Sequence, residues 1–269
     1  MIDYKMIPGE YCFPKGKHSI GINPIRQMFL LSMLDKYSQT HDNVNILEVG
    51  CWLGSSTVIF LSKAVEFFKS INMYCCDMWE PYRETDPDKQ KGADAIMNDA
   101  FESGIAREVF KHNVGVTGQS VTMLDGDSRK VLPTLEDGFF DIIFIDGNHL
   151  YEYVKNDMKE AKRLIKPGGF ICGDDLEISG HMVDGRDIDK ECVHNELYKG
   201  HYHPGVSLAH FEEFGVTGTY EGFWCVENVN NIWRSVDLRG IRCHLPPFMV
   251  SDECSSQFWT YMKKNGMTK

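Results

Sequence analysis

Residues 45–56 read Asn-Ile-Leu-Glu-Val-Gly-Cys-Trp-Leu-Gly-Ser-Ser, and this segment carries the clearest structural signal in the chain. It begins with a short apolar run, and Thr57 to Lys69 then repeat apolar residues at helical spacing. Gly50 and Gly54 mark a sharp turn between the two, because glycine accepts backbone conformations that other residues avoid. The segment therefore predicts a strand, a glycine turn and a helix whose N-terminus points backbone donors into the turn.

The same alternation of short apolar runs and helical segments continues to about Asp175. Such a pattern is typical of a parallel sheet with crossover helices. A helix at Tyr151–Ile165 is expected to stop at the Lys-Pro-Gly-Gly sequence that follows it. The expected strands are Asn45–Val49, Asn72–Cys76, Val121–Leu124, Asp141–Ile145 and Gly169–Gly173.

The flanking regions suggest how the chain is divided. We expect residues 1–44 to form an N-terminal helical cap or lid segment, whose helix at Pro24–Tyr37 either packs on the sheet or caps its top. We expect residues 45–269 to form one domain with a substrate loop inserted at about 178–205. Within this region His201-Tyr202-His203 is predicted to be solvated loop rather than a metal or base site.

The C-terminal part of the domain is expected to continue with a short helix at Gly205–Phe214. Two strands at Gly222–Glu227 and Ile232–Val236 follow, and they suit an antiparallel pair at the sheet edge. Their aromatic residues are predicted to lie in the core: Phe223, Trp224 and Trp233.

Composition excludes several classes of protein. The chain has 269 residues, of which 42% are hydrophobic and 25% charged, as in ordinary globular proteins. The net charge of −11 argues against a nucleic-acid partner, and no apolar run is long enough to cross a membrane. The nine cysteines form no CxxC pair, so we expect free thiols and a cytoplasmic location.

Three acidic residues lie within, at the end of, or just after successive predicted strands. Glu48 is embedded in an apolar strand, Asp77 ends the next one, and Asp127 follows the third. Each acid alone suits a loop cap, but together they favour a nucleoside crevice in which Asp77 accepts ribose hydroxyls. The glycine turn is also compatible with no ligand, because Trp52 stands where the dinucleotide pattern has its second glycine.

A second acidic group gives the sharpest signal. Asp146 ends the fourth predicted strand, and Asp174 and Asp175 end the fifth. Three carboxylates at one edge of the sheet repel one another unless a cation lies among them. Oxygen ligands favour Mg²⁺, with Ca²⁺ or Mn²⁺ as substitutes. The alternative is that Asp175 caps a turn and Asp174 forms a salt bridge.

These motifs resemble class I S-adenosylmethionine-dependent methyltransferases, especially the macrocin O-methyltransferase-like group and, more distantly, the catechol O-methyltransferases. The resemblance covers about residues 44–176. It implies a Rossmann-like α/β fold with a mostly parallel seven-stranded sheet, helices on both faces and an antiparallel last strand, with the C-terminal pair as strands six and seven. It is carried by NILEVGCWLGSST (45–57), CCDMW (75–79), DGDS (125–128) and FIDGNHLYEYVKNDMKEAKRLIKPGGFICGDD (144–175).

The resemblance also implies the site residues. A catalytic lysine of the catechol enzymes is replaced by His149, so His149 or Asp146 is the expected base, unless His149 only holds the loop by a structural hydrogen bond. Mg²⁺ would be bound by Asp146, Asp174 and Asp175. S-adenosylmethionine would contact Glu48, Gly50, Gly54, Ser55 and Ser56 at its methionine end, Asp77 at the ribose and Asp127 and Ser128 at the adenine. Its other expected contacts are Met78, Trp79, Asp146 and His149.

The expected activity is therefore Mg²⁺-dependent O-methylation of a small hydroxylated molecule, such as a sugar moiety of a natural product, a phenol or a diol. Two adjacent hydroxyls would chelate the ion best. One alternative is a metal-independent methyltransferase with His149 as base, and another is a non-catalytic protein that only binds S-adenosylmethionine. A homo-oligomer is compatible with the apolar N-terminal helix.

Overall fold

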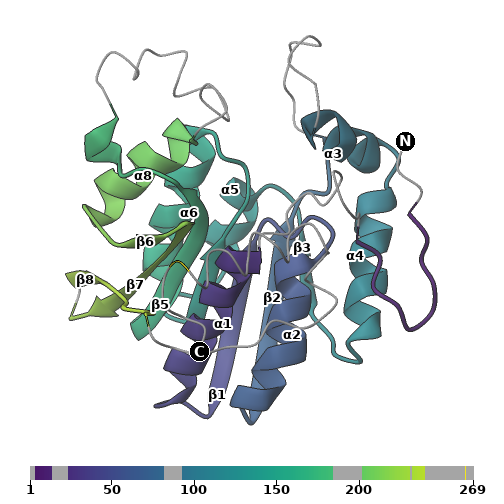
Figure 1. The fold of residues 1–269 in the computed structure, drawn as a ribbon, viewed down its shortest axis with the longest axis horizontal. Helices are drawn as coiled ribbons and strands as arrows, with labels where there is room; N and C mark the ends of the chain where they lie inside the picture. The colour runs from purple at the N-terminus through teal and green to yellow at the C-terminus, as the bar shows by residue number, and fades with distance from the viewer. Residues whose placement is uncertain are drawn as a thin grey trace.

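A computed structural model describes residues 4–13, 24–81, 93–183, 202–230, 232–239 and 264. Its centre is one eight-stranded sheet in which β3, β2, β1, β4, β5, β7 and β6 are neighbours in that order, and β8 also pairs with β7 (Figure 1). The strands are β1 (Asn43–Val49), β2 (Ser70–Asp77), β3 (Thr122–Asp125), β4 (Phe140–Ile145), β5 (Ile165–Leu176), β6 (Thr219–Tyr220), β7 (Gly222–Val229) and β8 (Ile232–Ser235).

The predicted mostly parallel, Rossmann-like sheet is confirmed. Strands β1 to β5 pair in parallel, and β7 runs antiparallel to β5. The prediction of seven strands was wrong by one, because β6 and β8 both pair with the free edge of β7. The predicted C-terminal pair is thus β7 and β8, and the two-residue β6 precedes them.

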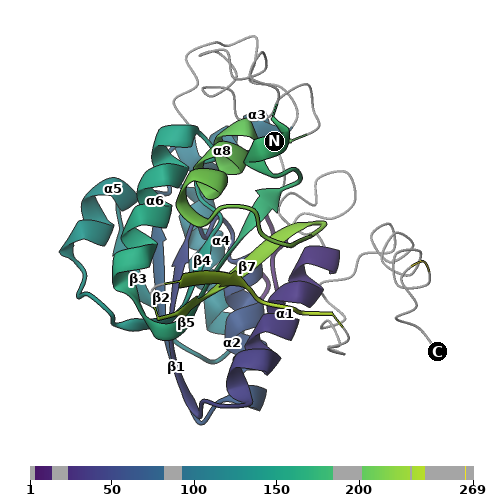
Figure 2. The same cartoon turned by 90° about the vertical axis from the view of Figure 1, so that its left-hand side faces the viewer.

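Helices cover both faces of the sheet, as predicted. Figure 2 shows α1 (Pro24–Ser38) and α2 (Ser55–Phe67) on one side, and α6 (Tyr151–Leu164) and α8 (Pro204–Phe214) on the other. Each side has its own apolar cluster, because the side chains of a strand alternate between its faces. The other helices are α3 (Ala93–Glu102), α4 (Ile105–Val116), α5 (Ser128–Val131) and the 3-10 turns η2 (Leu132–Thr134) and η3 (Gly180–Met182).

Helix α1 packs on the sheet face, which is one of the two arrangements considered from the sequence. Phe29 stacks on Tyr220 with ring centroids 4.6 Å apart, and Tyr37 meets the edge of Phe170 at 5.0 Å. These contacts fix α1 against β5 and β6. They also bring the first turn of α1 close to the end of β5.

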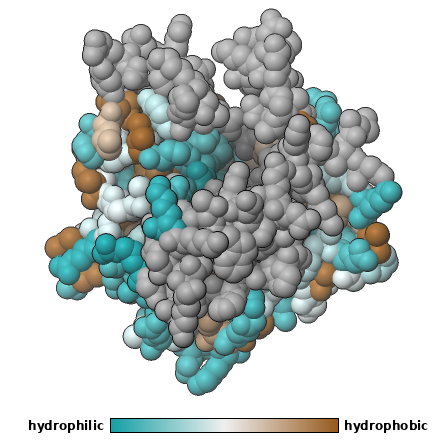
Figure 3. Space-filling model, viewed as in Figure 1, coloured by the Kyte–Doolittle hydropathy of each residue, from teal (hydrophilic) through white to brown (hydrophobic). Residues whose placement is uncertain are grey.

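The aromatic residues predicted for the core of the C-terminal strands are there. Phe223 and Trp224 are buried, and Trp233 packs partly buried against the same cluster as Trp224. On the face shown in Figure 3, the described hydrophobic residues lie in small separate groups between hydrophilic ones. Such scattered exposure is usual for a folded protein.

Part of the predicted substrate loop, residues 184–201, lies outside the described residues, and so does most of the polar segment Glu80–Gly92. Among the described helices, none has the length and apolarity needed to cross a membrane.

Candidate active site

A cavity of about 370 Å³ opens at the carboxyl ends of the parallel strands. Strand register explains its position: Val49 lies beside Cys76 on one side and Ile145 on the other, and Ile145 lies beside Gly173. The residues that follow these positions therefore meet at one edge, where α/β sheets bind ligands. The wall includes Gly50, Ser55, Ser56, Asp77, Met78, Asp127, Ser128, Asp146, His149, Asp174 and Asp175 from the predicted site, and also Arg26, Asp157 and His203.

Gly50 lets the turn after β1 lie directly against the end of β4. Its φ is 86°, and an added Cβ would lie 2.1 Å from the backbone oxygen of Asp146. Gly54 has the same φ and immediately precedes α2. An added Cβ at Gly54 would lie 3.1 Å from Cδ2 in the ring of Phe110. Gly54 is not among the residues that line the cavity, so its contact with a cofactor stays a prediction.

Glu48 lies behind the turn rather than on the cavity wall. Its carboxylate is fully buried and accepts hydrogen bonds from the hydroxyls of Ser56 and Thr57. Burial raises the pKa of Glu48 to about 8, although the two hydroxyl donors favour the charged form. Glu48 thus holds the first turn of α2, and any contact with a cofactor stays a prediction.

Asp77 holds the glycine turn through backbone hydrogen bonds. Its Oδ2 accepts from the N–H groups of Cys51 at 2.7 Å and Trp52 at 2.9 Å, and its Oδ1 accepts from the N–H of Trp79 at 2.7 Å. Burial raises its pKa despite these donors. Asp77 and Met78 line the cavity, whereas Trp79 is buried beside it and donates its indole N–H to the oxygen of Trp52 at 3.1 Å.

Asp127 combines a place on the cavity wall with a capping role. It is the N-cap of α5, and its Oδ1 accepts from the N–H of Arg129 at 3.0 Å. The guanidinium of Arg129 also reaches Oδ2 at 2.6 Å. These hydrogen bonds lower the pKa of Asp127, so its carboxylate is already engaged by Arg129.

Asp157 was not singled out from the sequence. It lies on α6 between the buried Val154 and Met158, and it is itself buried on the cavity wall. Burial raises the pKa of Asp157 to about 7, and its Oδ1 has no hydrogen-bond partner among the described residues. An aspartate on the apolar face of a helix was the signal that could have revealed it.

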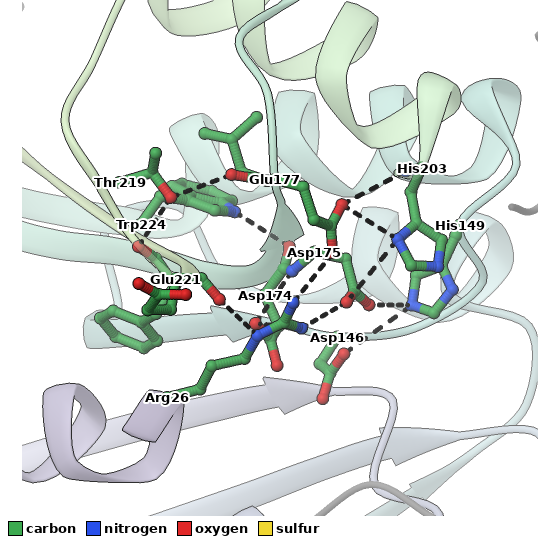
Figure 4. Close-up of polar contacts among 12 residues, drawn as sticks. Arg26, Asp146, His149, Asp174, Asp175, Glu177, His203, Thr219, Glu221 and Trp224 are labelled. Atoms are coloured by element: carbon green, nitrogen blue, oxygen red, sulfur yellow. Dashed lines mark hydrogen bonds and ion pairs between the residues drawn. The ribbon is translucent and has the colours of Figure 1, made fainter. Parts of the chain in front are cut away.

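The three predicted metal ligands meet at the rim of the cavity, together with a residue that was not predicted. Figure 4 shows the guanidinium of Arg26 reaching from α1 to the end of β5. Its Nη1 lies 2.8 Å from Oδ1 of Asp174 and 2.5 Å from Oδ1 of Asp175. A protein cation therefore compensates part of the charge that was expected to need a metal ion.

Two histidines border the same carboxylates. His149 Nε2 lies 3.0 Å from Oδ2 of Asp175 and 3.8 Å from Oδ1 of Asp146. His203 Nδ1 lies 3.7 Å from Asp175 and 3.2 Å from Glu177, with its ring 4.6 Å from that of His149 (Figure 4). The prediction of a solvated loop was wrong for His203, because its side chain is only 14% exposed and lies against Asp175 and Glu177.

Burial and neighbouring charges shift the pKa values of the carboxyl groups in this cluster in different directions. Burial raises the pKa of Asp146 and raises that of Asp174 well above its usual range, with the charge of Asp175 adding to the second shift. Burial opposes ionisation of Asp175 too, but His149, His203 and Arg26 outweigh it and lower its pKa. Asp175 is therefore the ionised anchor of the cluster near neutral pH.

The donors suit a cation, although their spacing differs from the predicted set. Among the described residues, His149, Asp175 and His203 offer ligand atoms that all lie within 4.8 Å of one another. Asp146, Asp174 and Asp175 do not form such a group. Arg26 binds the Oδ1 atoms of Asp174 and Asp175, whereas Asp146 lies toward His149.

The reversed strand beside β5 and the crevice at the carboxyl ends of β1, β2 and β4 agree with the fold that the resemblance to class I methyltransferases implied. Residues 47–176 match the family model described as a methyltransferase domain, so this part of the chain is a domain of that family. A comparison with curated proteins finds no significant match.

Solved structures with a related fold include cofactor-bound Rv0187 from MTB, with 18% identity, 82% of this chain and 84% of that chain covered and a TM-score of 0.49. The O-methyltransferase NovP has 18% identity, with 60% and 68% covered and a TM-score of 0.43. An O-methyltransferase from Bacillus cereus in complex with SAH has 19% identity, with 62% of each chain covered and a TM-score of 0.42.

Proposed function

We propose that this enzyme transfers the methyl group of S-adenosylmethionine to a hydroxyl oxygen of a small molecule, with Mg²⁺ bound at the rim of the cavity. The observation that carries this proposal is the meeting of three carboxylates and His149 on the wall of one crevice. A sugar moiety of a natural product, a phenol or another diol is the proposed acceptor.

The described residues suit the cofactor. S-adenosylmethionine supplies a methyl group that its sulfonium charge has already activated. Ser55 and Ser56 begin α2, so backbone donors face the crevice there. The unpaired Oδ1 of Asp157 is an acceptor for an amino group such as that of adenine. We therefore propose that Asp157 shares the adenine end with Ser128, since Arg129 already engages Asp127.

The chain must align the acceptor oxygen and help it lose its proton. His149 is the proposed base, because its Nε2 lies between the carboxylates of Asp146 and Asp175, which would stabilise the imidazolium formed when the ring takes a proton. Asp175 orients the ring through its ionised carboxylate. Asp146 is adjacent to both the glycine turn and His149, so it can share this role.

Asp146, Asp174 and Asp175 are the residues proposed to hold Mg²⁺, with Ca²⁺ or Mn²⁺ as substitutes. A bound Mg²⁺ would lower the pKa of the acceptor hydroxyl and fix its direction. Carboxylate oxygens are hard donors of the kind that this ion prefers. Arg26 must then share or release its two aspartate partners.

A second candidate is a methyltransferase that works without metal, with His149 as base. The specific observation in its favour is the guanidinium of Arg26, which already supplies a cation to Asp174 and Asp175. A chelator distinguishes the two: the first candidate loses turnover on metal removal, and the second does not.

The deciding experiment uses Asp174→Ala with a panel of diols and phenols as acceptors. We expect metal-dependent turnover to be lost. The affinity for S-adenosylhomocysteine should change by no more than about threefold, which corresponds to less than about 1 kcal/mol. Asp125→Ala is the control, since Asp125 is an exposed carboxylate at the end of β3. Unchanged turnover in Asp174→Ala would rule out the metal role, and cofactor binding without turnover on any acceptor would favour a non-catalytic protein.

We also propose that the enzyme works in the reducing cytoplasm, without nucleic-acid or membrane partners, and that it can form a homo-oligomer. The free thiols of Cys12, Cys51, Cys75, Cys76, Cys172 and Cys225, all buried, support the reducing compartment. Gel filtration with light scattering measures the oligomeric state.

A further inference from the structure

We infer that Arg26 is a resident cation of the carboxylate cluster, which competes with a divalent ion for Asp174 and Asp175 and so sets the metal affinity of the site. This inference rests on the metal site of the proposed function. It assigns to the first turn of α1 a role in choosing between a protein cation and a metal ion.

All three nitrogens of the Arg26 guanidinium have partners. Nη1 contacts Asp174 at 2.8 Å and Asp175 at 2.5 Å, and Nη2 contacts Oε1 of Glu177 at 2.9 Å. Nε donates to the backbone oxygen of Glu221 at 2.7 Å. Only 16% of the side chain is exposed, so water screens these ion pairs little.

The backbone is shaped to receive this guanidinium. Gly222 begins β7 with a φ of +99°, and an added Cβ would lie 2.5 Å from Nη2 and 2.7 Å from Cζ of Arg26. The guanidinium therefore occupies space that any other residue at position 222 would fill. The turn between β6 and β7 supplies this space, and the same turn supplies the oxygen of Glu221.

Arg26 and a metal ion would need the same oxygens. The Oδ1 atoms of Asp174 and Asp175 both face Nη1, and a divalent ion bound by these two carboxylates must draw them away or share them. A planar guanidinium is always charged and binds carboxylates in a fixed geometry, so it is an effective competitor. Glu177 adds a third carboxylate that anchors Arg26 but was not expected to bind the ion.

The test is calorimetric titration of Mg²⁺ into the wild-type protein and Arg26→Met, which removes the charge but keeps an apolar stem. We expect Arg26→Met to bind Mg²⁺ at least tenfold more tightly, because its carboxylates lose their competing cation. Lys36→Met is the matched control: it removes a cation from the last turn of the same helix and should change the Mg²⁺ affinity less than about twofold. Electron paramagnetic resonance of Mn²⁺ in the same three proteins gives a second measure of binding.

Arg26→Gln covers the case in which the methionine variant does not fold, since the amide nitrogen of glutamine can take the place of Nε and donate to the backbone oxygen of Glu221. It should also bind Mg²⁺ at least tenfold more tightly than the wild type. Equal or weaker binding in folded Arg26 variants overturns the inference but leaves the Mg²⁺ role intact. Absence of Mg²⁺ binding in every protein overturns both. Titration of S-adenosylhomocysteine into the same samples reports separately on the methyltransferase proposal.

Discussion

Gly222 lies against Arg26 so closely that a single methyl group between them would be 2.5 Å from Nη2. Gly222→Ala should therefore displace the guanidinium, and we expect it to lower the free energy of unfolding by about 2–4 kcal/mol through steric clash and backbone strain. Urea unfolding measures this loss.

Gly104→Ala separates the two causes, because Gly104 lies in the left-handed region with a φ of 72° and a ψ of 0° but has open space around its added Cβ. It should lose only the strain, about 1–2 kcal/mol. Equal losses in the two variants would mean that the contact with Arg26 does not constrain position 222.

The turn after β1 offers a similar pair. Gly50 and Gly54 both have a φ of +86°, but a Cβ would lie 2.1 Å from the backbone of Asp146 at Gly50 and 3.1 Å from the flexible ring of Phe110 at Gly54. We expect Gly50→Ala to cost roughly 3–5 kcal/mol of unfolding free energy and Gly54→Ala about 1–3 kcal/mol. Urea unfolding of both variants measures these losses. A larger loss of unfolding free energy in Gly54→Ala than in Gly50→Ala would contradict this account.

Asp77 should matter for the cofactor because it fixes the backbone of the glycine turn. Asparagine at this position presents an N–H₂ group where a carboxylate oxygen now accepts from Cys51 and Trp52 or from Trp79. We expect Asp77→Asn to weaken S-adenosylhomocysteine binding by about tenfold or more, as measured by calorimetry.

Asp125→Asn is the control for this change, because Asp125 pairs in register with Asp77 on β3 but forms an exposed ion pair with Arg107. The affinity of Asp125→Asn for S-adenosylhomocysteine should stay within about twofold of the wild-type value. A similar loss in both variants would indicate a general effect of charge instead of a specific role for the turn.

His210 should make the protein sensitive to acid. Its ring is fully buried against Trp224 at 4.7 Å, and burial lowers its pKa to about 3. The unfolded chain binds the proton first, near pH 6.5, so the stabilising effect of neutral His210 is complete above that pH. It is lost as pH falls toward 3, by up to about 1.4 kcal/mol per pH unit.

His210→Gln should therefore show a shallower loss of stability than the wild type between pH 6 and pH 4, measured by urea unfolding at each pH. His181→Gln is the control, since His181 is exposed. Parallel curves for the wild type and His210→Gln would refute the role of the buried imidazole.

Local patterns were enough to predict most of the sheet. Strand β4 is buried at every position, and its uninterrupted apolar run is the sequence signal of a strand covered on both faces. The acids at the ends of β2, β4 and β5 could be predicted to converge because parallel strands end at the same edge. Residues Asp77, Asp146 and Asp174 do line one cavity.

The partners from distant segments could not be predicted in the same way. Nothing in the pattern of α1 distinguishes Arg26 from an ordinary surface cation, because its carboxylate partners lie on β5. The contacts of His203 with Asp175 and Glu177 join residues that lie 26 or more positions apart in the sequence, and short-range periodicity does not report such contacts. The two-residue β6 is too short to leave a periodic signal.

Calorimetric and thermal titration of the wild-type protein with S-adenosylhomocysteine tests whether the crevice is a cofactor site. We expect saturable binding to one site per chain. At about a hundred times the dissociation constant, the ligand should stabilise the fold by roughly 2.7 kcal/mol and raise Tm by about 5–10 °C. A folded protein with neither binding heat nor a change in Tm would contradict the assignment of this chain as an S-adenosylmethionine-dependent methyltransferase.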